Sequence, residues 1–456
     1  MLKMNRRHFL SRGMALAGLS ASNRFLGSGL GLLSQVAMAS SQTFTDHKAL
    51  VMVFLTGGID SLGLLIPASN DGYSRYQTIR QQLAIPQAEL LDFGLPNYGA
   101  PPWCDAMVNM YQRGDLAWVS NVGPLRQPTT KAMIENNAGA MPIFIGSHNS
   151  QQILWQSGSM NPNAREGWGA RMLELMQLNS SLISPSISLD RSQLFTTTLA
   201  TPTFTVDPWG VRNIPIIGDE TFDQDNFART QFYHLQQQNR SSLLGREVAA
   251  RHVLTLENSA FLKDVLAQVP ATAVTYPTAT GYSAASFQRQ LQMAARLIEA
   301  APILEQPRQV IMVQMHGFDT HDNQDRDLPN LVSALFGNLM AFQDDLATRS
   351  VAENVVTFSQ SDFGRTPTIN ANGTDHGWGG HYFIVGEPVI GGKVVGNIPR
   401  FGVETDNMLY NLSIPDIRVE QYAANLARWF GLSKTEIRDV FPGLVNFDDV
   451  DFGVLA

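Results

Sequence analysis

The first apolar run of the chain is Lys48-Ala49-Leu50-Val51-Met52-Val53-Phe54-Leu55, and it ends in Thr56-Gly57-Gly58. A short, continuous run without polar alternation is typical of a strand that is buried on both faces, as in a parallel sheet covered by helices. Comparable runs follow at residues 116–122, 309–315, 354–359 and 382–385. The sequence therefore predicts a central sheet whose strands lie mostly parallel.

Helical patterns separate these runs and lie at residues 103–112, 287–300 and 328–347. Strands that alternate with helices of this length indicate an α/β fold. A polar, Gln-rich stretch interrupts the alternation, and we interpret it as a helical insertion around residues 219–300. Because no internal repeat or sharp change of composition marks a second domain, residues 46–455 are expected to form one domain.

Composition excludes several classes of protein. The chain has 456 residues, 44% of them hydrophobic and 16% charged, which is too apolar for a disordered protein. Its formal net charge is −8, and the body of the chain has no basic cluster, so a nucleic-acid partner is not expected. The single cysteine, Cys104, excludes an internal disulfide framework and a Cys-rich metal site.

The N-terminal segment has the features of an export signal. Residues 1–39 carry a charge of +5 and leave −13 to the remainder of the chain. A basic start, an apolar stretch and an Ala-Met-Ala ending are typical of a cleaved signal peptide, and the segment at residues 5–10, Asn-Arg-Arg-His-Phe-Leu, resembles a twin-arginine motif. Asn23 and Arg24 interrupt the apolar stretch, which disfavours a permanent membrane anchor. We expect the twin-arginine machinery to export the protein to the periplasm or the extracellular space.

Three segments rich in Asp and His follow predicted strands, and a fourth lies just before the last predicted strand. They are Gly-Gly-Ile-Asp-Ser at residues 57–61, His-Gly-Phe-Asp-Thr-His at 316–321, Ser-Asp-Phe-Gly-Arg-Thr at 361–366 and Thr-Asp-His-Gly-Trp-Gly-Gly-His at 374–381. Ligands of open α/β sheets bind at the carboxyl ends of strands, so these segments are expected to converge. Carboxylate and imidazole ligands suit Zn²⁺, Mn²⁺ or Fe, and Mg²⁺ or Ca²⁺ where oxygen dominates. Arg365 is a candidate for pairing with an oxyanion.

Individual residues also have simpler interpretations. Asp60 suits a helix cap as well as a ligand, and His316 suits an ordinary buried histidine. Ser61 is a candidate nucleophile, although no Gly-x-Ser-x-Gly elbow surrounds it. A second group, His148 with the polar residues up to Gln152, fits either the wall of a polar ligand cleft or the capped start of a helix.

These motifs resemble the secreted bacterial family catalogued as domain of unknown function 1501. The segments that carry the resemblance are Gly-Gly-x-Asp at residues 57–60, Ser-His-Asn-x-x-Gln-x-x-Trp at 147–155, Gly-Phe-Asp-Thr-His at 317–321, Ser-Asp-Phe-Gly-Arg-Thr at 361–366, Asp-His-Gly-Trp-Gly-Gly-His at 375–381 and Gln-Tyr-Ala-Ala-Asn-Leu-Ala-Arg-Trp-Phe-Gly at 421–431. The resemblance spans nearly all of residues 46–455. It implies a fold of the alkaline phosphatase and sulfatase superfamily, with a mixed sheet between helix layers and a two-metal site.

The chain departs from the pattern of active enzymes in that superfamily. Phe363 stands where such enzymes usually have a histidine ligand, and Asp319 and His321 are closer together than the usual pair. The nucleophile after the first strand has no secure counterpart, and Cys104 lies outside a sulfatase motif. These departures argue against a covalent intermediate and leave metal-assisted hydrolysis by water, or a silent binding site.

Two functions therefore follow as hypotheses. The first is an exported metal-dependent hydrolase of phosphate or sulfate esters, in which Arg365 holds the anion and Ser61 is the candidate nucleophile. Its candidate metal ligands are Asp60, Asp319, His321, Asp362, Asp375, His376 and His381. The second is a non-catalytic extracytoplasmic protein that uses the same cleft for a carbohydrate or a cell-surface partner. Under either hypothesis the candidate small-molecule ligand is anionic or a carbohydrate.

Overall fold

The computed structural model describes residues 44–137, 141–178, 182–200, 203–211, 227–238, 240–405 and 407–456. The chain divides into two units, Met1–Gln42 and Thr43–Ala456. The first unit contains the predicted export signal and lies outside the described residues, as does the start of the predicted insertion at residues 219–226. None of the described helices combines the length and the apolar character that crossing a membrane requires.

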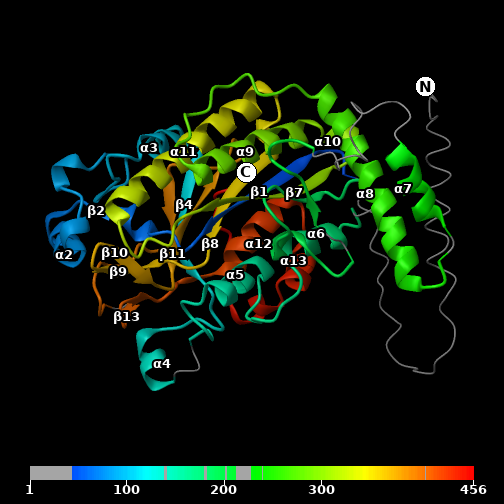
Figure 1. Cartoon of the computed structure of the whole chain (residues 1–456). Helices are drawn as coiled ribbons and strands as arrows, with labels where there is room; N and C mark the ends of the chain where they lie inside the picture. The colour runs from blue at the N-terminus through cyan, green and yellow to red at the C-terminus, as the bar shows by residue number, and fades with distance from the viewer. Residues whose placement is uncertain are drawn as a thin grey trace. The chain divides into compact units, whose positions relative to one another are not determined.

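A nine-stranded sheet forms the centre of the described part (Figure 1). The strand order is β12-β4-β11-β8-β1-β7-β5-β6, and β15 also pairs with β4. The strands are β1 Lys48–Thr56, β4 Leu116–Gly123, β5 Ser186–Ser188, β6 Phe204–Thr205, β7 Arg308–His316, β8 Val355–Ser361, β11 Gly380–Val385, β12 Lys393–Val395 and β15 Ile417–Arg418. Only β11 runs antiparallel to its neighbours, β4 and β8. The predicted α/β fold with a mostly parallel sheet is confirmed, and each of the five apolar runs forms a strand.

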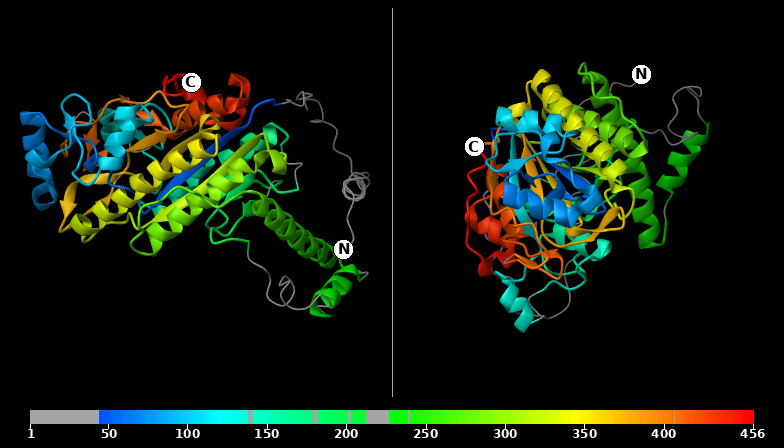
Figure 2. Two further views of the ribbon diagram at one scale, coloured as in Figure 1. Left: turned by 90° about the horizontal axis from the view of Figure 1, so that it is seen from above. Right: turned by 90° about the vertical axis from the view of Figure 1, so that its left-hand side faces the viewer.

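Strand β1 explains why the sheet is covered on both faces. Its side chains alternate: Ala49 and Val51 join one hydrophobic core with α3, α9 and α11, whereas Leu50 and Met52 join a second core with α6, α12 and α13. The two groups of helices lie on opposite sides of the sheet (Figure 1 and Figure 2). The helices are α2 Asn70–Arg80, α3 Asp105–Arg113, α4 Lys131–Asn136, α5 His148–Ser157, α6 Trp168–Leu175, α7 Phe227–Gln237, α8 Leu243–Gln268, α9 Tyr282–Glu299, α10 Ala301–Leu304, α11 Gln324–Thr348, α12 Val419–Phe430 and α13 Lys434–Val440.

Helix α9 shows how the helical pattern produces this packing. Phe287, Leu291, Ala294 and Ile298 recur at helical spacing, and all four side chains are fully buried. The side-chain amide of Gln290 also bonds to the backbone of Gln314 on β7, accepting at 2.7 Å and donating at 3.0 Å. The helix is therefore fixed to the sheet by both apolar and polar contacts.

Three strand pairs lie outside the main sheet. They are β2 Ile66–Pro67 with β3 Tyr98–Gly99, β9 Arg365–Asn370 with β10 Gly373–His376, and β13 Met408–Leu409 with β14 Leu412–Ser413. The β9–β10 hairpin follows the carboxyl end of β8 and carries the Thr-Asp-His segment. This hairpin therefore belongs to the edge of the sheet where the polar segments were expected to meet.

Candidate metal centre

Three adjacent strands bring the Asp- and His-rich segments together. Strand β1 pairs in parallel with β7 on one side and with β8 on the other, so the carboxyl ends of all three strands lie side by side. Gly57 makes the close approach of two of these loops feasible. Its φ is +117°, and a Cβ at this position would lie 2.3 Å from the backbone nitrogen of Asp319.

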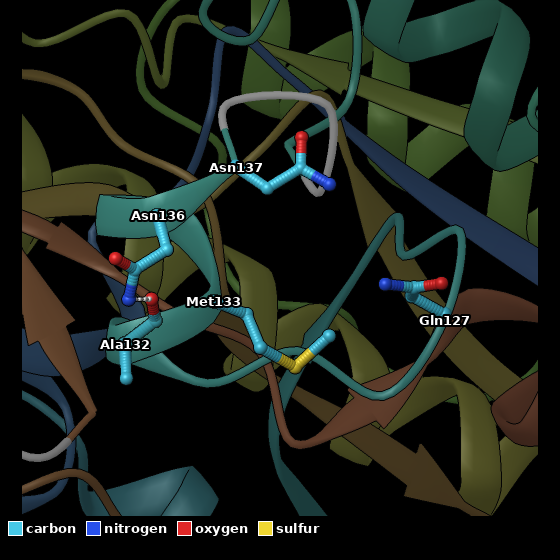
Figure 3. Close-up of a pocket in the computed structure, with 5 residues that line it drawn as sticks. All are labelled: Gln127, Ala132, Met133, Asn136 and Asn137. Atoms are coloured by element: carbon cyan, nitrogen blue, oxygen red, sulfur yellow. Dashed lines mark hydrogen bonds between the residues drawn. The ribbon is translucent and has the colours of Figure 1, made fainter.

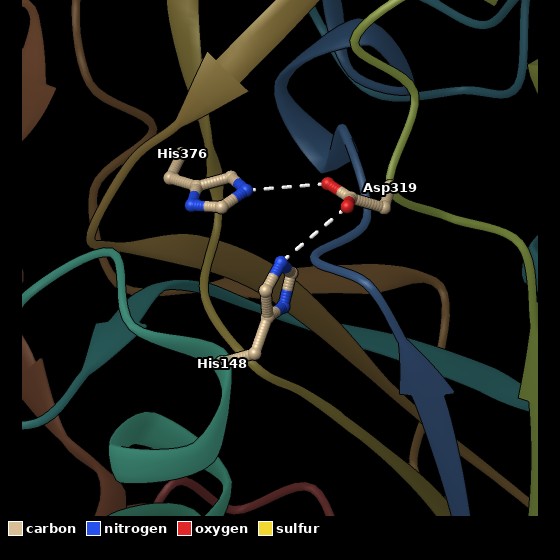
Figure 4. A group of neighbouring side chains, drawn as sticks. All are labelled: His148, Asp319 and His376. Carbon is tan, nitrogen blue, oxygen red and sulfur yellow. Dashed lines mark hydrogen bonds and ion pairs between the residues drawn. The ribbon is translucent and has the colours of Figure 1, made fainter.

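His148, Asp319 and His376 form the centre of the site (Figure 4). The Nε2 atom of His376 lies 3.2 Å from Oδ1 of Asp319, and Nε2 of His148 lies 3.4 Å from Oδ2 of the same carboxylate. One ligand atom from each of the three residues lies within 4.8 Å of the others. The side chains come from the start of α5, the loop after β7 and the end of β10.

His321 extends this group to four side chains. Its Nε2 atom lies 3.1 Å from Oδ1 of Asp319 and 2.9 Å from Nε2 of His376. Ligand atoms around a tetrahedral Zn²⁺ ion with bonds of ~2.0–2.1 Å are about 3.3 Å apart. The separations of 3.1–3.4 Å between Asp319 and the three imidazoles are of this size, and the group whose ligand atoms all lie within 4.8 Å of one another is His148, Asp319 and His376.

The other ring nitrogen of each imidazole, Nδ1, contacts an oxygen atom. Nδ1 of His148 lies 2.5 Å from Oδ2 of Asp362, and Nδ1 of His376 lies 2.7 Å from the carbonyl oxygen of Gly146. Nδ1 of His321 lies 3.2 Å from a carboxylate oxygen of Asp375. In the neutral ring, donation from Nδ1–H leaves a lone pair on Nε2. All three lone pairs then face Asp319.

Asp362 and Asp375 therefore support the imidazoles from behind. The Asp362 carboxylate is fully buried and also accepts the backbone N–H of Gly57 at 3.2 Å and the amide of Gln152 at 3.3 Å. Asp375 additionally accepts from Asn370 at 2.8 Å. Such outer carboxylates fix the tautomer of a ligating histidine and raise its basicity.

Arg365 is buried and joins three loops. It donates to the carbonyl oxygens of Gly57, Gly58, Phe318 and Thr374, and it forms an ion pair with Asp319. Nearly every N–H of the guanidinium thus has a protein acceptor. This geometry makes Arg365 a residue that positions Asp319, whereas the sequence suggested that it holds a substrate anion.

The pKa values follow from these contacts. The hydrogen bond to Asp362 raises the pKa of His148, while burial lowers the pKa of His376. Burial alone would raise the pKa of Asp319, but the hydrogen bond and the charge of Arg365 outweigh it, so that pKa is lowered. The carboxylate at the centre is therefore ionised at neutral pH and is suited to a cation.

Two predicted ligands lie outside this group. Asp60 is buried and forms a two-pronged ion pair with Arg80 at 2.6 and 2.7 Å, and its carboxylate also accepts from Gln324 and from the backbone of Gly63. His381 is buried, and its Nδ1 accepts from the backbone N–H of Asn121 at 3.1 Å. Burial lowers the pKa of His381 to about 4. The hydrogen-bond partners of both side chains lie elsewhere in the protein, so neither side chain belongs to the group around Asp319.

Ser61 is also buried. Its Oγ accepts the backbone N–H of His381 at 2.7 Å. The hydroxyl therefore contacts the start of β11, and no contact joins it to His148, Asp319 or His376 among the described residues.

Sequence reasoning placed His148 in a separate polar group. The structure brings it to Asp319, because α5 begins beside the β9–β10 hairpin: Gly146, two residues before the helix, contacts His376. Phe363 packs against both imidazoles, with ring centroids 5.0 Å from His148 and 4.4 Å from His376. The aromatic ring is thus a wall of the site.

Two cavities lie away from this centre. One of about 310 Å³ adjoins α4 and is lined by Gln127, Ala132, Met133, Asn136 and Asn137 (Figure 3). The other, of about 440 Å³, lies beside α9 and includes Trp209, Arg289 and Arg296 in its lining. By contrast, the side chains of the centre itself are between 25% and 46% exposed and are open to solvent.

Comparisons with known proteins give one family and several similar folds. The family model described as "Protein of unknown function (DUF1501)" matches residues 105–441. No curated protein matches the chain.

Solved structures that resemble the chain include the PsFucS1 sulfatase from Pseudoalteromonas sp., with 9% identity, a TM-score of 0.35, and coverage of 90% of this chain and 72% of that chain. The wild-type alkaline phosphatase PafA has 11% identity and a TM-score of 0.30, with 71% of this chain and 64% of that chain covered. The C-terminal periplasmic domain of EcEptC from Escherichia coli, in complex with Zn, has 10% identity and a TM-score of 0.31, with 76% and 75% covered.

Proposed function

We propose that this chain, which belongs to the DUF1501 family, holds one divalent metal ion at His148, Asp319 and His376 and hydrolyses phosphate or sulfate esters there. His321 is the fourth side chain within reach of the same ion. The observation that carries the proposal is the orientation of the three imidazoles. Each has its Nδ1 against an oxygen atom and its Nε2 toward Asp319.

The donor set favours particular metals. Imidazole nitrogen with one carboxylate suits Zn²⁺ or Mn²⁺ better than Mg²⁺ or Ca²⁺, which prefer oxygen ligands. When bound, such an ion polarises an ester oxygen and makes water a better nucleophile at neutral pH. The supporting residues orient the metal ligands: Asp362 and Asp375 orient two of the imidazoles, and Arg365 orients Asp319.

Water is the nucleophile in this proposal. Ser61 is buried and already hydrogen-bonded to the backbone of His381, so it is not used. Direct attack by water requires no covalent intermediate. The partly exposed side chains of the site leave room for an ester group to approach the ion.

The same observation about Ser61 also favours a second candidate function. A centre without a side-chain nucleophile suits an extracytoplasmic protein that binds a carbohydrate or a cell-surface partner without turnover. Both candidates include export by the twin-arginine machinery, which the sequence at residues 5–10 supports. Fusion of residues 1–45 to a reporter, with and without an Arg6→Lys and Arg7→Lys change, tests that step.

Metal content and ester hydrolysis together test the proposal. Purified protein is loaded with Zn²⁺ or Mn²⁺, passed through a desalting column, and assayed with 4-nitrophenyl phosphate and 4-nitrophenyl sulfate. His148→Ala and His376→Ala are expected to lose both the metal and the activity. His252→Ala, an exposed histidine on α8, is the matched control and keeps both. Metal that binds without hydrolysis of either ester would leave the binding function, and no metal at all would overturn the proposed metal-dependent hydrolase.

A further inference from the structure

A cavity beside α9 combines positive charge with an aromatic surface. It has a volume of about 440 Å³, which is large enough for a small ligand. Its lining includes the side chains of Trp209, Thr272, Arg289, Gln292 and Arg296. Among the residues that the structure describes, the lining contains two guanidinium groups and no carboxylate, although residues 40–456 together carry a net charge of −13.

This cavity is separate from the candidate metal centre. Gln290 on α9 bonds to Gln314, and the carbonyl of Leu297 accepts from Gln309. The segment of α9 from Arg289 to Arg296 therefore runs alongside β7 from Gln314 back toward Gln309, away from the carboxyl end of the strand. The metal centre lies beyond the carboxyl end of that strand, after His316.

The two arginines are incompletely paired by the protein. Arg289 makes one long hydrogen bond, at 3.4 Å, to Gln292, and its guanidinium lies 5.2 Å from the ring centroid of Trp209. Arg296 donates to the carbonyl oxygens of Leu266 and Val269 at the end of α8, but its buried Nε has no hydrogen-bond partner among the described residues. Burial and the nearby Arg349 lower the pKa of Arg296 and outweigh the opposite effect of Glu299.

Trp209 supplies the second part of the site. It is 55% exposed, whereas Trp118, Trp155, Trp168 and Trp378 are almost fully buried. A half-exposed indole presents a flat apolar face, and such faces stack on the apolar side of sugar rings. Arg289 keeps the ring in place through its cation–π contact.

We infer that this cavity is a second ligand site, which binds a small carbohydrate carrying a sulfate, phosphate or carboxylate group. Arg289 and Arg296 pair with the anion, because guanidinium forks match oxyanions in geometry and charge. Trp209 stacks on the sugar ring, while Thr272 and Gln292 contribute polar contacts to the ring hydroxyls. The site selects an anionic sugar over a neutral sugar and over an inorganic anion, because only an anionic sugar contacts both the two arginines and the indole ring.

Equilibrium binding, followed by tryptophan fluorescence and by calorimetry, tests the inference. The probes are glucose 6-sulfate, glucose 6-phosphate, glucuronate, glucose and inorganic sulfate. At least one of the three anionic sugars is expected to bind, and glucose and sulfate at least tenfold more weakly. Arg289→Gln is expected to weaken binding at least tenfold, and Trp209→Phe to remove most of the fluorescence change.

Two controls separate this site from the others. Arg251→Gln removes an exposed arginine of α8 and is expected to leave the affinity unchanged. His376→Ala is expected to bind the anionic sugar as the wild type does, because the metal centre is elsewhere. Loss of binding in His376→Ala with retention in Arg289→Gln would overturn the inference. So would the absence of binding by all three anionic sugars in a wild-type protein with a normal unfolding transition.

Discussion

Replacement of Asp362 by asparagine tests how the site orients its imidazoles. The Asp362 carboxylate is buried, holds Nδ1 of His148 at 2.5 Å and accepts the backbone N–H of Gly57 at 3.2 Å. Asparagine has nearly the same shape but no charge, and with its NH₂ group in place of Oδ1 its oxygen can still meet both donors. The variant therefore keeps the packing and removes the charged support of one proposed ligand.

The expected size of the effect follows from the role of the carboxylate. Loss of an outer partner of a ligating histidine typically lowers metal affinity about 10–100-fold, or about 1.4–2.7 kcal/mol. The hydrogen bond to Asp362 raises the pKa of His148, so Asp362→Asn lowers that pKa. Protons then compete less with the metal below pH 7. The loss of affinity is therefore expected to be larger at pH 8 than at pH 6.

Zinc titration against a chelating indicator at pH 8 and pH 6 measures this difference. Asp264→Asn changes an exposed aspartate of α8 and is the matched control, with unchanged affinity at both pH values. Equal affinities of wild type and Asp362→Asn at pH 8 would refute the supporting role of Asp362. A loss of zinc affinity that is larger at pH 6 than at pH 8 would refute the assignment of the raised pKa of His148 to its contact with Asp362.

Three further changes give separate tests. Gly57→Ala places a Cβ 2.3 Å from the backbone of Asp319 at a φ of +117°, so it should destabilise the fold by about 1–3 kcal/mol in urea unfolding and lower zinc affinity. His381 has a pKa of about 4 against an ordinary 6.5. Its contribution to the free energy of unfolding, about 3 kcal/mol, is therefore complete above pH 6.5 and is lost as the pH falls toward 4. His381→Gln should therefore lose less stability than the wild type between pH 7 and pH 4.5 in urea titrations. Arg365→Gln leaves the Asp319 carboxylate without its buried partner, so zinc affinity should fall, and a stable variant with unchanged affinity would contradict the positioning role.

The fold could be predicted from the sequence because burial on both faces leaves a clear pattern. Leu50 and Val51 belong to opposite cores, so both must be apolar, and the run shows no alternation. The convergence of Asp319, His321 and His376 was also expected, since these residues lie at the ends of strands that were predicted to form one mostly parallel sheet.

The membership of the site could be predicted only in part. The partner of Asp60 is Arg80, on α2, and nothing in the sequence links the two residues. His148 lies more than 170 positions before Asp319, and its contact depends on the approach of Gly146 to His376. Its motif, Ser-His-Asn-x-x-Gln, was the available signal, because Gln152 and His148 both bind Asp362.

Metal stoichiometry tests the central claim most directly. Full-length protein loaded with excess Zn²⁺, desalted and analysed by inductively coupled plasma mass spectrometry is expected to retain about one ion per chain, as the single ligand group of His148, Asp319 and His376 requires. The double variant His148→Ala, His376→Ala is expected to retain none, and His252→Ala one. A folded wild-type protein that retains no metal, or a double variant that retains as much as the wild type, would contradict the account.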